Sequence, residues 1–171
     1  MSLNPALLSE GTVDLIIKHL KDNFNAYAAH PDFQYTDGIS LEPVNSFYIN
    51  RKFESLDLPA IYVLIGAHIF QYQDNQNYLN AEDDVLIVLS AEDTDTENLT
   101  RKMFRYGRIL HALFNIQDLS TADGRLKLVT VPSRLGYAED VISAMPKQAK
   151  RFRMDAVLEL KVQHYENNLT I

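Results

Sequence analysis

The alternation of hydrophobic and polar residues is most regular between residues 84 and 114. A short apolar run at residues 85–89 is typical of a buried strand, and an acidic, turn-prone link over residues 90–95 follows it. Thr94 with Glu97 three residues later matches a capping box, which predicts the start of a helix. The apolar side chains of that helix form one stripe: Leu99, Met103, Tyr106, Leu110, Leu113 and Phe114. This strand–turn–helix unit is the centre of the predicted fold.

A second amphipathic pattern predicts a helix over residues 12–29, after a loose leader at residues 1–9. Thr12 or Ser9 is expected to cap its start. The helix is expected to end at His30, because a residue that precedes a proline is biased away from the helical region. Its apolar side chains share a narrow arc: Val13, Ile16, Ile17, Leu20, Phe24 and Tyr27.

Three strands are expected between the two helices. Residues 44–53 alternate loosely, residues 60–69 are rich in β-branched and aromatic side chains, and residues 82–89 contain the central apolar run. The polar residues 71–80 read as a hairpin tip or a loop. Two long strands joined in this way predict an antiparallel pair.

After the second helix, residues 126–131 alternate as a fourth strand that ends before Pro132. Residues 151–165 alternate over a long run and predict a C-terminal strand, followed by a frayed tail at residues 166–171. Residues 31–43 and 133–150 show no regular pattern.

This order of elements predicts an α+β domain. We expect one mainly antiparallel, mixed sheet of about five strands with two main helices packed on it, because the strict alternation of a doubly wound fold is missing. We also expect residues 1–171 to form a single domain, since no repeat or second core is evident.

Composition narrows the classes of function. The 171 residues include no cysteine, which excludes disulfides, thiolate metal sites and cysteine nucleophiles. The sequence contains neither an apolar run that spans a bilayer nor a secretory signal pattern, so we expect a soluble, intracellular protein without membrane contact. A formal charge of −7 argues against a general or sequence-specific nucleic-acid binder.

The charge is unevenly distributed. Residues 53–100 hold no Lys or Arg and 10 acidic side chains, whereas residues 101–171 hold 12 basic and 7 acidic ones. Faces of opposite sign favour head-to-tail self-association or steering of a partner. On charge alone, an ordinary solvated surface explains the pattern equally well.

No residue set predicts catalysis or a cofactor. The five histidines (His19, His30, His68, His111 and His164) lack metal-ligand spacing, although a composite site built from distant residues stays open. The carboxylates at residues 82–84 are expected to keep a strand start solvated, and those at residues 92–95 to cap the helix. Every glycine is isolated, so no phosphate-binding loop is expected.

The basic segment at residues 147–153 has two interpretations. It is either an edge guarded against aggregation by Lys and Arg, or a contact for an acidic neighbour. The arginines of the second helix are expected to lie opposite its apolar stripe. Candidate subunit or partner contacts are therefore Lys147, Lys150, Arg151, Arg153, Arg101, Arg105, Arg108, Tyr72, Tyr78, Glu82 and Asp83.

Several local features resemble the tail terminator and tail completion (head–tail joining) proteins of long-tailed bacteriophages. These are the N-terminal amphipathic helix, the segment Leu58-Pro59-Ala60-Ile61-Tyr62-Val63 that opens a strand, an acidic strand start at residues 82–85, and Asp93-Thr94-Asp95 leading into a helix with Arg105-Tyr106-Gly107-Arg108-Ile109-Leu110. The resemblance covers most of residues 12–165 as an order of elements.

The resemblance implies a structural subunit without enzymatic activity or cofactor. Members of that family form a ring, commonly a hexamer, that caps the tail tube and joins it to the head–neck complex. It implies self-association, contact with tube and neck proteins, and a location in the bacterial cytoplasm and then the virion. Alternatives are another neck component, such as a connector completion protein, and a small enzyme or ligand-binding domain with a composite site.

Overall fold

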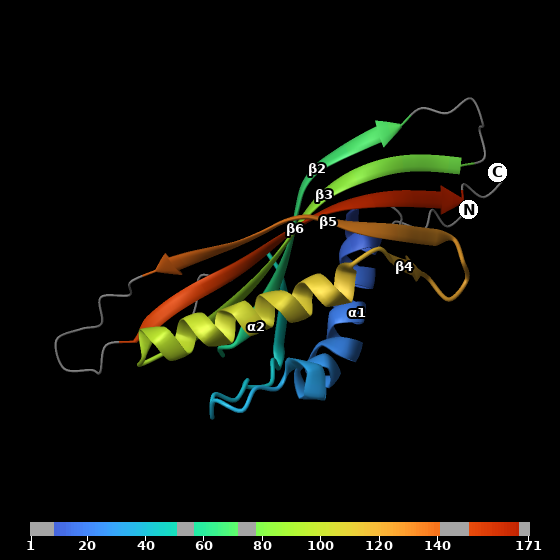
Figure 1. Cartoon of the computed structure of the whole chain (residues 1–171). Helices are drawn as coiled ribbons and strands as arrows, with labels where there is room; N and C mark the ends of the chain where they lie inside the picture. Colours follow the sequence, from blue (N-terminus) through green and yellow to red (C-terminus); the bar gives the residue numbers. More distant parts are fainter. Residues whose placement is uncertain (1–8, 51–56, 72–77, 141–150, 168–171) are drawn as a thin grey trace.

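The chain forms one six-stranded sheet with two long helices (Figure 1). A computed structural model describes residues 9–50, 57–71, 78–140 and 151–167. The elements in chain order are α1 (Ser9–Ala29), a short 3-10 helix η1 (Pro31–Phe33), β1 (Ser46–Ile49), β2 (Ala60–Gln71), β3 (Tyr78–Asp93), α2 (Thr96–Phe114), β4 (Gln117–Ser120), β5 (Leu126–Asp140) and β6 (Phe152–Asn167). The α+β prediction is confirmed, with six strands where about five were expected.

The strand order is β1-β2-β3-β6-β5-β4. The expected antiparallel pair of β2 and β3 is confirmed, and β3 pairs with the full length of β6, from Tyr78↔Asn167 to Asp93↔Phe152. β5 and β4 continue the antiparallel order, whereas β1 runs parallel to β2. The last strand therefore lies at the centre of the sheet, which agrees with its long alternating pattern.

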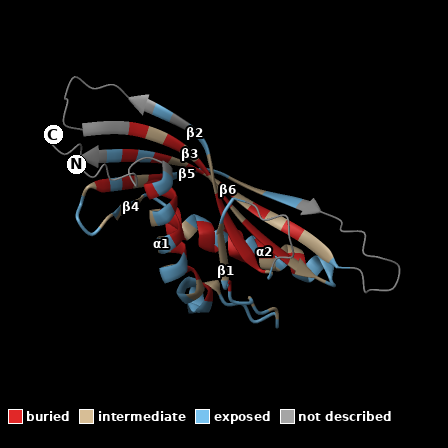
Figure 2. Cartoon of the chain, turned by 180° about the vertical axis from the view of Figure 1, so that it is seen from behind, coloured by how far each residue is buried: buried red, intermediate tan, exposed pale blue. Residues whose placement is uncertain are grey.

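Both helices lie on the same side of the sheet (Figure 1). Alternate residues of β3 and β6 face them and are buried, as are most of the apolar residues of α1 and α2 (Figure 2). Along β6 the buried set is Met154, Ala156, Leu158, Leu160 and Val162. This one face holds most of the core. Burying each large aliphatic side chain there contributes about 1.5–3 kcal/mol.

Helix α2 begins one residue later than its capping box predicted. The N-cap is Asp95, whose Oδ1 accepts a hydrogen bond from the Asn98 amide at 2.9 Å. Glu97 pairs with Arg101 at 2.8 Å. The Thr94 prediction is wrong because Asp caps a helix as well as Thr does, and Asp95 has the extended backbone that an N-cap requires.

The predicted end of the fourth strand at Pro132 is also wrong. β5 continues to Asp140, with a register shift between Pro132 and Arg134. β4 pairs with β5 only as far as Thr130, so Pro132 lies on an edge and at a bulge, two places where proline is tolerated. The extra residue moves Leu135 and Tyr137 onto the face that carries Leu128 before the bulge, since their partners on β6 also face the helices.

Other boundaries differ by a few residues. Ser9 already belongs to α1, β1 is shorter than residues 44–53, and β3 begins at Tyr78 inside the expected 71–80 loop. The four-residue strand β4 was not predicted, because a polar run of that length carries no clear alternation. β6 extends through residues 166 and 167 of the expected tail. Residues 1–8, 51–56, 72–77, 141–150 and 168–171 lie outside the described part of the chain, so predictions for them, including the last part of the expected 44–53 strand, stay predictions.

Candidate functional site

The acidic and basic parts of the chain lie side by side, because β3 pairs with β6. Arg151 contacts Glu92 at one end of the pair. Lys161 contacts Asp84 and lies 3.5 Å from Glu82 further along. The hydrogen bond to Asp84 raises the pKa of Lys161. Part of the charge asymmetry that predicted faces of opposite sign is therefore neutralised within one copy, which weakens charge as an argument for self-association.

A third pair joins the end of β3 to α2. Lys102 Nζ lies 2.8 Å from Asp93 Oδ2 and 3.1 Å from Glu42 Oε1. Burial acts to raise the pKa of Asp93, but hydrogen bonds from Lys102 and from the Asp95 amide outweigh it, and the pKa lies below its ordinary value. The carboxylates at residues 93–95 thus serve the helix start and its neighbour, in agreement with the structural interpretation made from the sequence.

The arginines of α2 do not form one solvated stripe. Residues 34–45, named the strap here, lead from η1 to β1 beside α2 and cover Arg105, whose side chain is only 7% exposed. Arg105 contacts Asp37, donates to the Ile39 carbonyl at 2.6 Å and lies over the Tyr35 ring. The expectation of a free arginine is wrong at this position because a segment without a regular sequence pattern packs over it.

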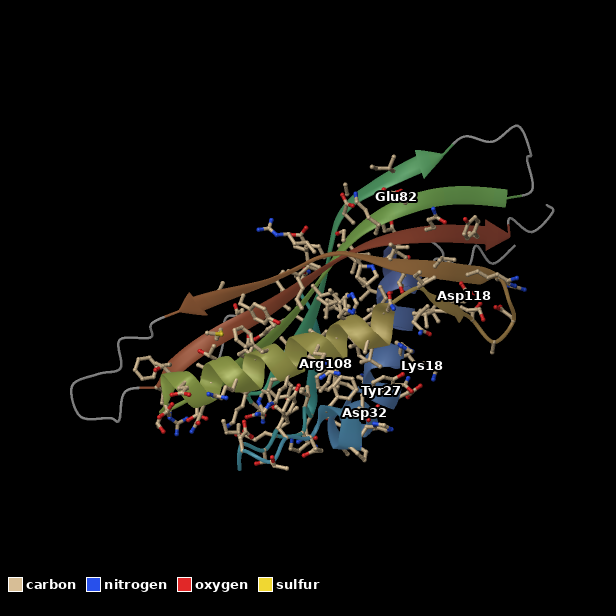
Figure 3. The ribbon with its side chains drawn as sticks, in the orientation of Figure 1. Lys18, Tyr27, Asp32, Glu82, Arg108 and Asp118 are labelled. Atoms are coloured by element: carbon tan, nitrogen blue, oxygen red, sulfur yellow. The ribbon has the colours of Figure 1, made fainter. Side chains whose placement is uncertain are left out.

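The two flanking arginines are exposed. Arg101 pairs with Glu97 on the same helix, and Arg108 donates to the Tyr35 hydroxyl at 2.9 Å and lies 5.2 Å from the Phe33 ring. Figure 3 shows Arg108 on the side of α2 that faces the strap. Contact of either arginine with a partner stays a prediction.

Arg153, predicted as a surface contact, is held within the chain. It lies on the face of the sheet away from the helices with a side chain 13% exposed. Its guanidinium donates to Ser90 Oγ at 3.0 Å and to the Tyr62 hydroxyl at 3.3 Å, and lies 3.6 Å from Asp155. The alternation of β6 and its pairing with β3 explain this cluster, which no local sequence signal indicated.

The least expected cluster joins α1 to the sheet. Thr12 Oγ1 donates to Asp83 Oδ2 at 2.9 Å and lies 3.2 Å from His164 Nδ1, which in turn is 3.5 Å from the same carboxylate oxygen. All three residues are fully buried. Asp83 was predicted to keep a strand start solvated, and Thr12 to cap a helix. Both predictions are wrong, because Asp83 lies inside β3 between Ala81 and Val85 on the apolar face.

Alternation offered a signal for this cluster. Asp83 and His164 each occupy a core-facing position of a long alternating strand, so burial could have been inferred for both from that pattern. Threonine, histidine and aspartate are residue types used in nucleophilic catalysis, but a hydroxyl with no exposed surface does not reach a substrate in this conformation. The geometry instead ties the first turns of α1 to β3 and β6.

The face of the sheet away from the helices carries a row of half-buried apolar side chains. Leu64, Leu86, Val88 and Val157 are neighbours across three strands, by the pairs Leu64↔Leu86 and Val88↔Val157. We call these four residues the open-face patch. No helix of the described part of the chain covers it (Figure 1). On its border lie the pairs Lys161–Asp84 and, at 3.8 Å, Arg134–Glu159.

The remaining candidates divide into two groups. Glu82 lies on β3, half-buried, at the end of the sheet away from α2 (Figure 3). Tyr72, Lys147 and Lys150, and the side chain of Tyr78, lie outside what the structure describes. Among the described residues, no group of three or more His, Asp or Glu could hold a metal ion. No helix among the described residues is long and apolar enough to cross a membrane.

Comparison with known proteins gives little further information. No protein-family model and no curated protein matches the sequence. Among solved structures, the chain is similar to one titled "Virion of native gene transfer agent (GTA) particle", with a TM-score of 0.46 and 14% identity over 88% of this chain and 93% of that chain. A similarity of this size does not establish a shared fold or function.

Proposed function

We propose that this chain is a structural subunit of a phage or prophage tail, which forms a ring that caps the tail tube and joins it to the head–neck complex. The observation that carries the proposal is the open-face patch on a sheet whose other face holds the core beneath α1 and α2. The type of assembly comes from the resemblance of residues 58–63 and 105–110 to tail terminator proteins.

The patch has the layout of a protein–protein contact. Contiguous apolar side chains rimmed by charged residues mark interaction surfaces on soluble proteins. Here Leu86 and Val157 lie at the centre, and the ion pairs of Lys161 and Arg134 lie at the rim. A neighbouring subunit or the tube covers the centre, and the rim pairs stay close to water. In this proposal the protein works by assembly, without a catalytic step or a cofactor.

Co-assembly with a tail tube protein tests the proposal. The wild-type protein is mixed with tube protein from the same phage or prophage, and negative-stain electron microscopy records the tube ends and their length. We expect capped tubes and rings that are hexamers by light scattering. The double variant Leu86→Lys, Val157→Lys should leave the tubes uncapped, because two charges placed in the patch oppose its burial.

The matched control is Ile116→Lys, which replaces an isoleucine that is 70% exposed in the turn after α2. It should cap tubes as the wild type does. Circular dichroism and thermal melting of all three proteins establish that the monomers fold. Capping by the double variant at the wild-type level would contradict the role of the patch. Failure of the folded wild-type protein to bind tubes would contradict the proposed function.

A further inference from the structure

The sheet has an open strand edge on each side. β2 pairs with β1 only over Ala60–Val63, and over residues 64–71 no described strand lies on its outer side. β5 pairs with β4 only over residues 127–130, and over residues 131–140 its outer side is likewise open in the described part of the chain. Figure 1 shows the two open stretches pointing to opposite ends of the molecule, and Figure 2 shows exposed residues on both.

The open stretch of β2 lacks the side chains that normally guard an edge. Residues 64–71 contain no Asp, Glu, Lys, Arg or Pro, and Ile69 is 50% exposed. Native proteins blunt exposed edges with lysine, proline or bulges, because unpaired N–H and C=O groups are a template for another strand. A bulge between Ile65 and His68 interrupts this edge, but its apolar composition fits a stretch that another strand covers.

The direction of the strands indicates which strand of a second copy can pair with the open edge of β2. β2, β3, β6 and β5 alternate in direction, so β2 and β5 are antiparallel to each other. A second copy placed in the same orientation beside β2 therefore presents its β5 in the antiparallel direction. Two-fold pairing of β2 with β2 would also be antiparallel, but it would leave both β5 edges open, whereas head-to-tail pairing satisfies both edges of every copy.

The position of the two open stretches fits a closed ring. The open part of β2 lies at the end of the sheet where β3 begins, and the open part of β5 lies at the end where β6 begins. Copies joined through these stretches are staggered along the strand direction. A sheet that closes on itself requires tilted strands and such a stagger, whereas a flat sheet requires none.

We infer that successive copies of this chain join head to tail by antiparallel pairing of residues 64–71 of one copy with residues 131–140 of the next. The inference rests on the self-association in the proposed function, and adds to it which two segments pair between neighbouring copies. Main-chain hydrogen bonds between the two edges supply the contact, on β5 chiefly beyond the bulge between Pro132 and Arg134, as in other cases where a strand is added to a sheet edge.

Engineered cysteines test this pairing, since the chain has no native cysteine. Ile69→Cys lies on the open face, as do Arg134→Cys, Gly136→Cys and Ala138→Cys on β5. The Ile69→Cys protein is mixed with each β5 variant, assembled with tube protein and oxidised. Because a disulfide requires Cα atoms within about 7 Å, one register should give one strongly linked heterodimer among the three mixtures.

Two controls sharpen the result. Ile69→Cys alone should give no disulfide dimer, because head-to-tail pairing keeps identical edges apart. Lys18→Cys, exposed on α1, should not link to any β5 variant. A dimer of Ile69→Cys alone, or assembled rings in which none of the three mixtures links, would overturn the inference and leave the proposed function standing. A wild-type protein that neither self-associates nor caps tubes would instead contradict the proposed function itself.

A second measurement avoids engineered cysteines. Ala67→Lys with Ile69→Lys places two lysines on an edge that has none, and both positions are exposed. We expect self-association to weaken by at least about tenfold, equal to about 1.4 kcal/mol, with the melting of the monomer unchanged. Ile116→Lys is the matched control. Equal association of the edge variant and the wild type would contradict the inference.

Discussion

The two faces of the sheet differ in how far their polar residues are buried. On the face that the helices cover, the polar groups Thr12, Asp83 and His164 are fully buried and contact one another. On the open face, the Lys161–Asp84 pair stays accessible, and the four apolar residues of the open-face patch are only half-buried. The first face is complete within one chain. In the proposed function, the second is completed by another protein.

The loss of stability should differ most between the two faces when one member of an ionisable pair is removed from each. His164→Ala deletes a buried partner of Asp83 and Thr12, and should lower the free energy of unfolding by about 3–5 kcal/mol. Lys161→Ala, on the open face, should have little measurable effect because water replaces the partner of Asp84. Urea unfolding of both variants checks this, and equal losses would break the comparison.

Neighbouring residues of β6 allow the same test with apolar side chains. Leu158→Ala, on the packed face with no exposed surface, should cost about 2–5 kcal/mol through lost burial and a cavity. Val157→Ala, in the open-face patch, should cost the isolated chain less than about 1 kcal/mol, because its site is only half-buried. If the two substitutions destabilised the monomer equally, the open face would not be open.

The helix that covers the packed face offers a smaller test. Asp95→Ala removes the N-cap of α2 and should cost about 1 kcal/mol, seen as a lower melting temperature. Thr94→Ala should leave the melting temperature unchanged, since Thr94 lies outside the helix and is exposed. The reverse result would restore the capping box that the sequence predicted.

The smallest effect concerns acid stability at the junction of β3 and α2. The pKa of Asp93 is lowered in the folded chain, so its ionised form stabilises the fold above the ordinary value of 3.8. That contribution is lost as the pH falls through the lowered pKa. Asp93→Asn and Lys102→Met should therefore reduce the loss of stability between pH 7 and acid pH by similar amounts. Unfolding curves that keep the wild-type pH dependence in both variants would contradict a contribution of the Asp93–Lys102 pair to acid stability.

Period-two patterns explain why much of the sheet was predictable. Residues of β3 and β6 alternate over most of their length, so their existence and the packed face followed from the sequence. The same pattern held the signal for Asp83, but an acidic run was interpreted as solvated. Burial of a charged residue at a core-facing position can be predicted only when its partner is known. The partner of Asp83 is His164, which is distant in sequence.

Other features depended on contacts between distant segments. Arg105 is buried by the strap, whose sequence has no period, so its position followed only from the packing of residues 34–45 on α2. Pro132 ends a strand in most settings, and only the edge position of β5 beyond Thr130 makes it tolerable. The open-face patch required the strand order, because Leu86 and Val157 become neighbours only once β6 pairs with β3.

Hydrogen exchange read by mass spectrometry tests the central claim most directly, that neighbouring copies pair along the two open strand edges of this sheet. The isolated chain of 19.5 kDa and the same chain assembled on tail tubes are compared peptide by peptide. We predict slower exchange on assembly in residues 64–71 and 131–140, with no change in the solvent-facing residues of α1. Unchanged exchange in both stretches of an assembled ring would contradict the account.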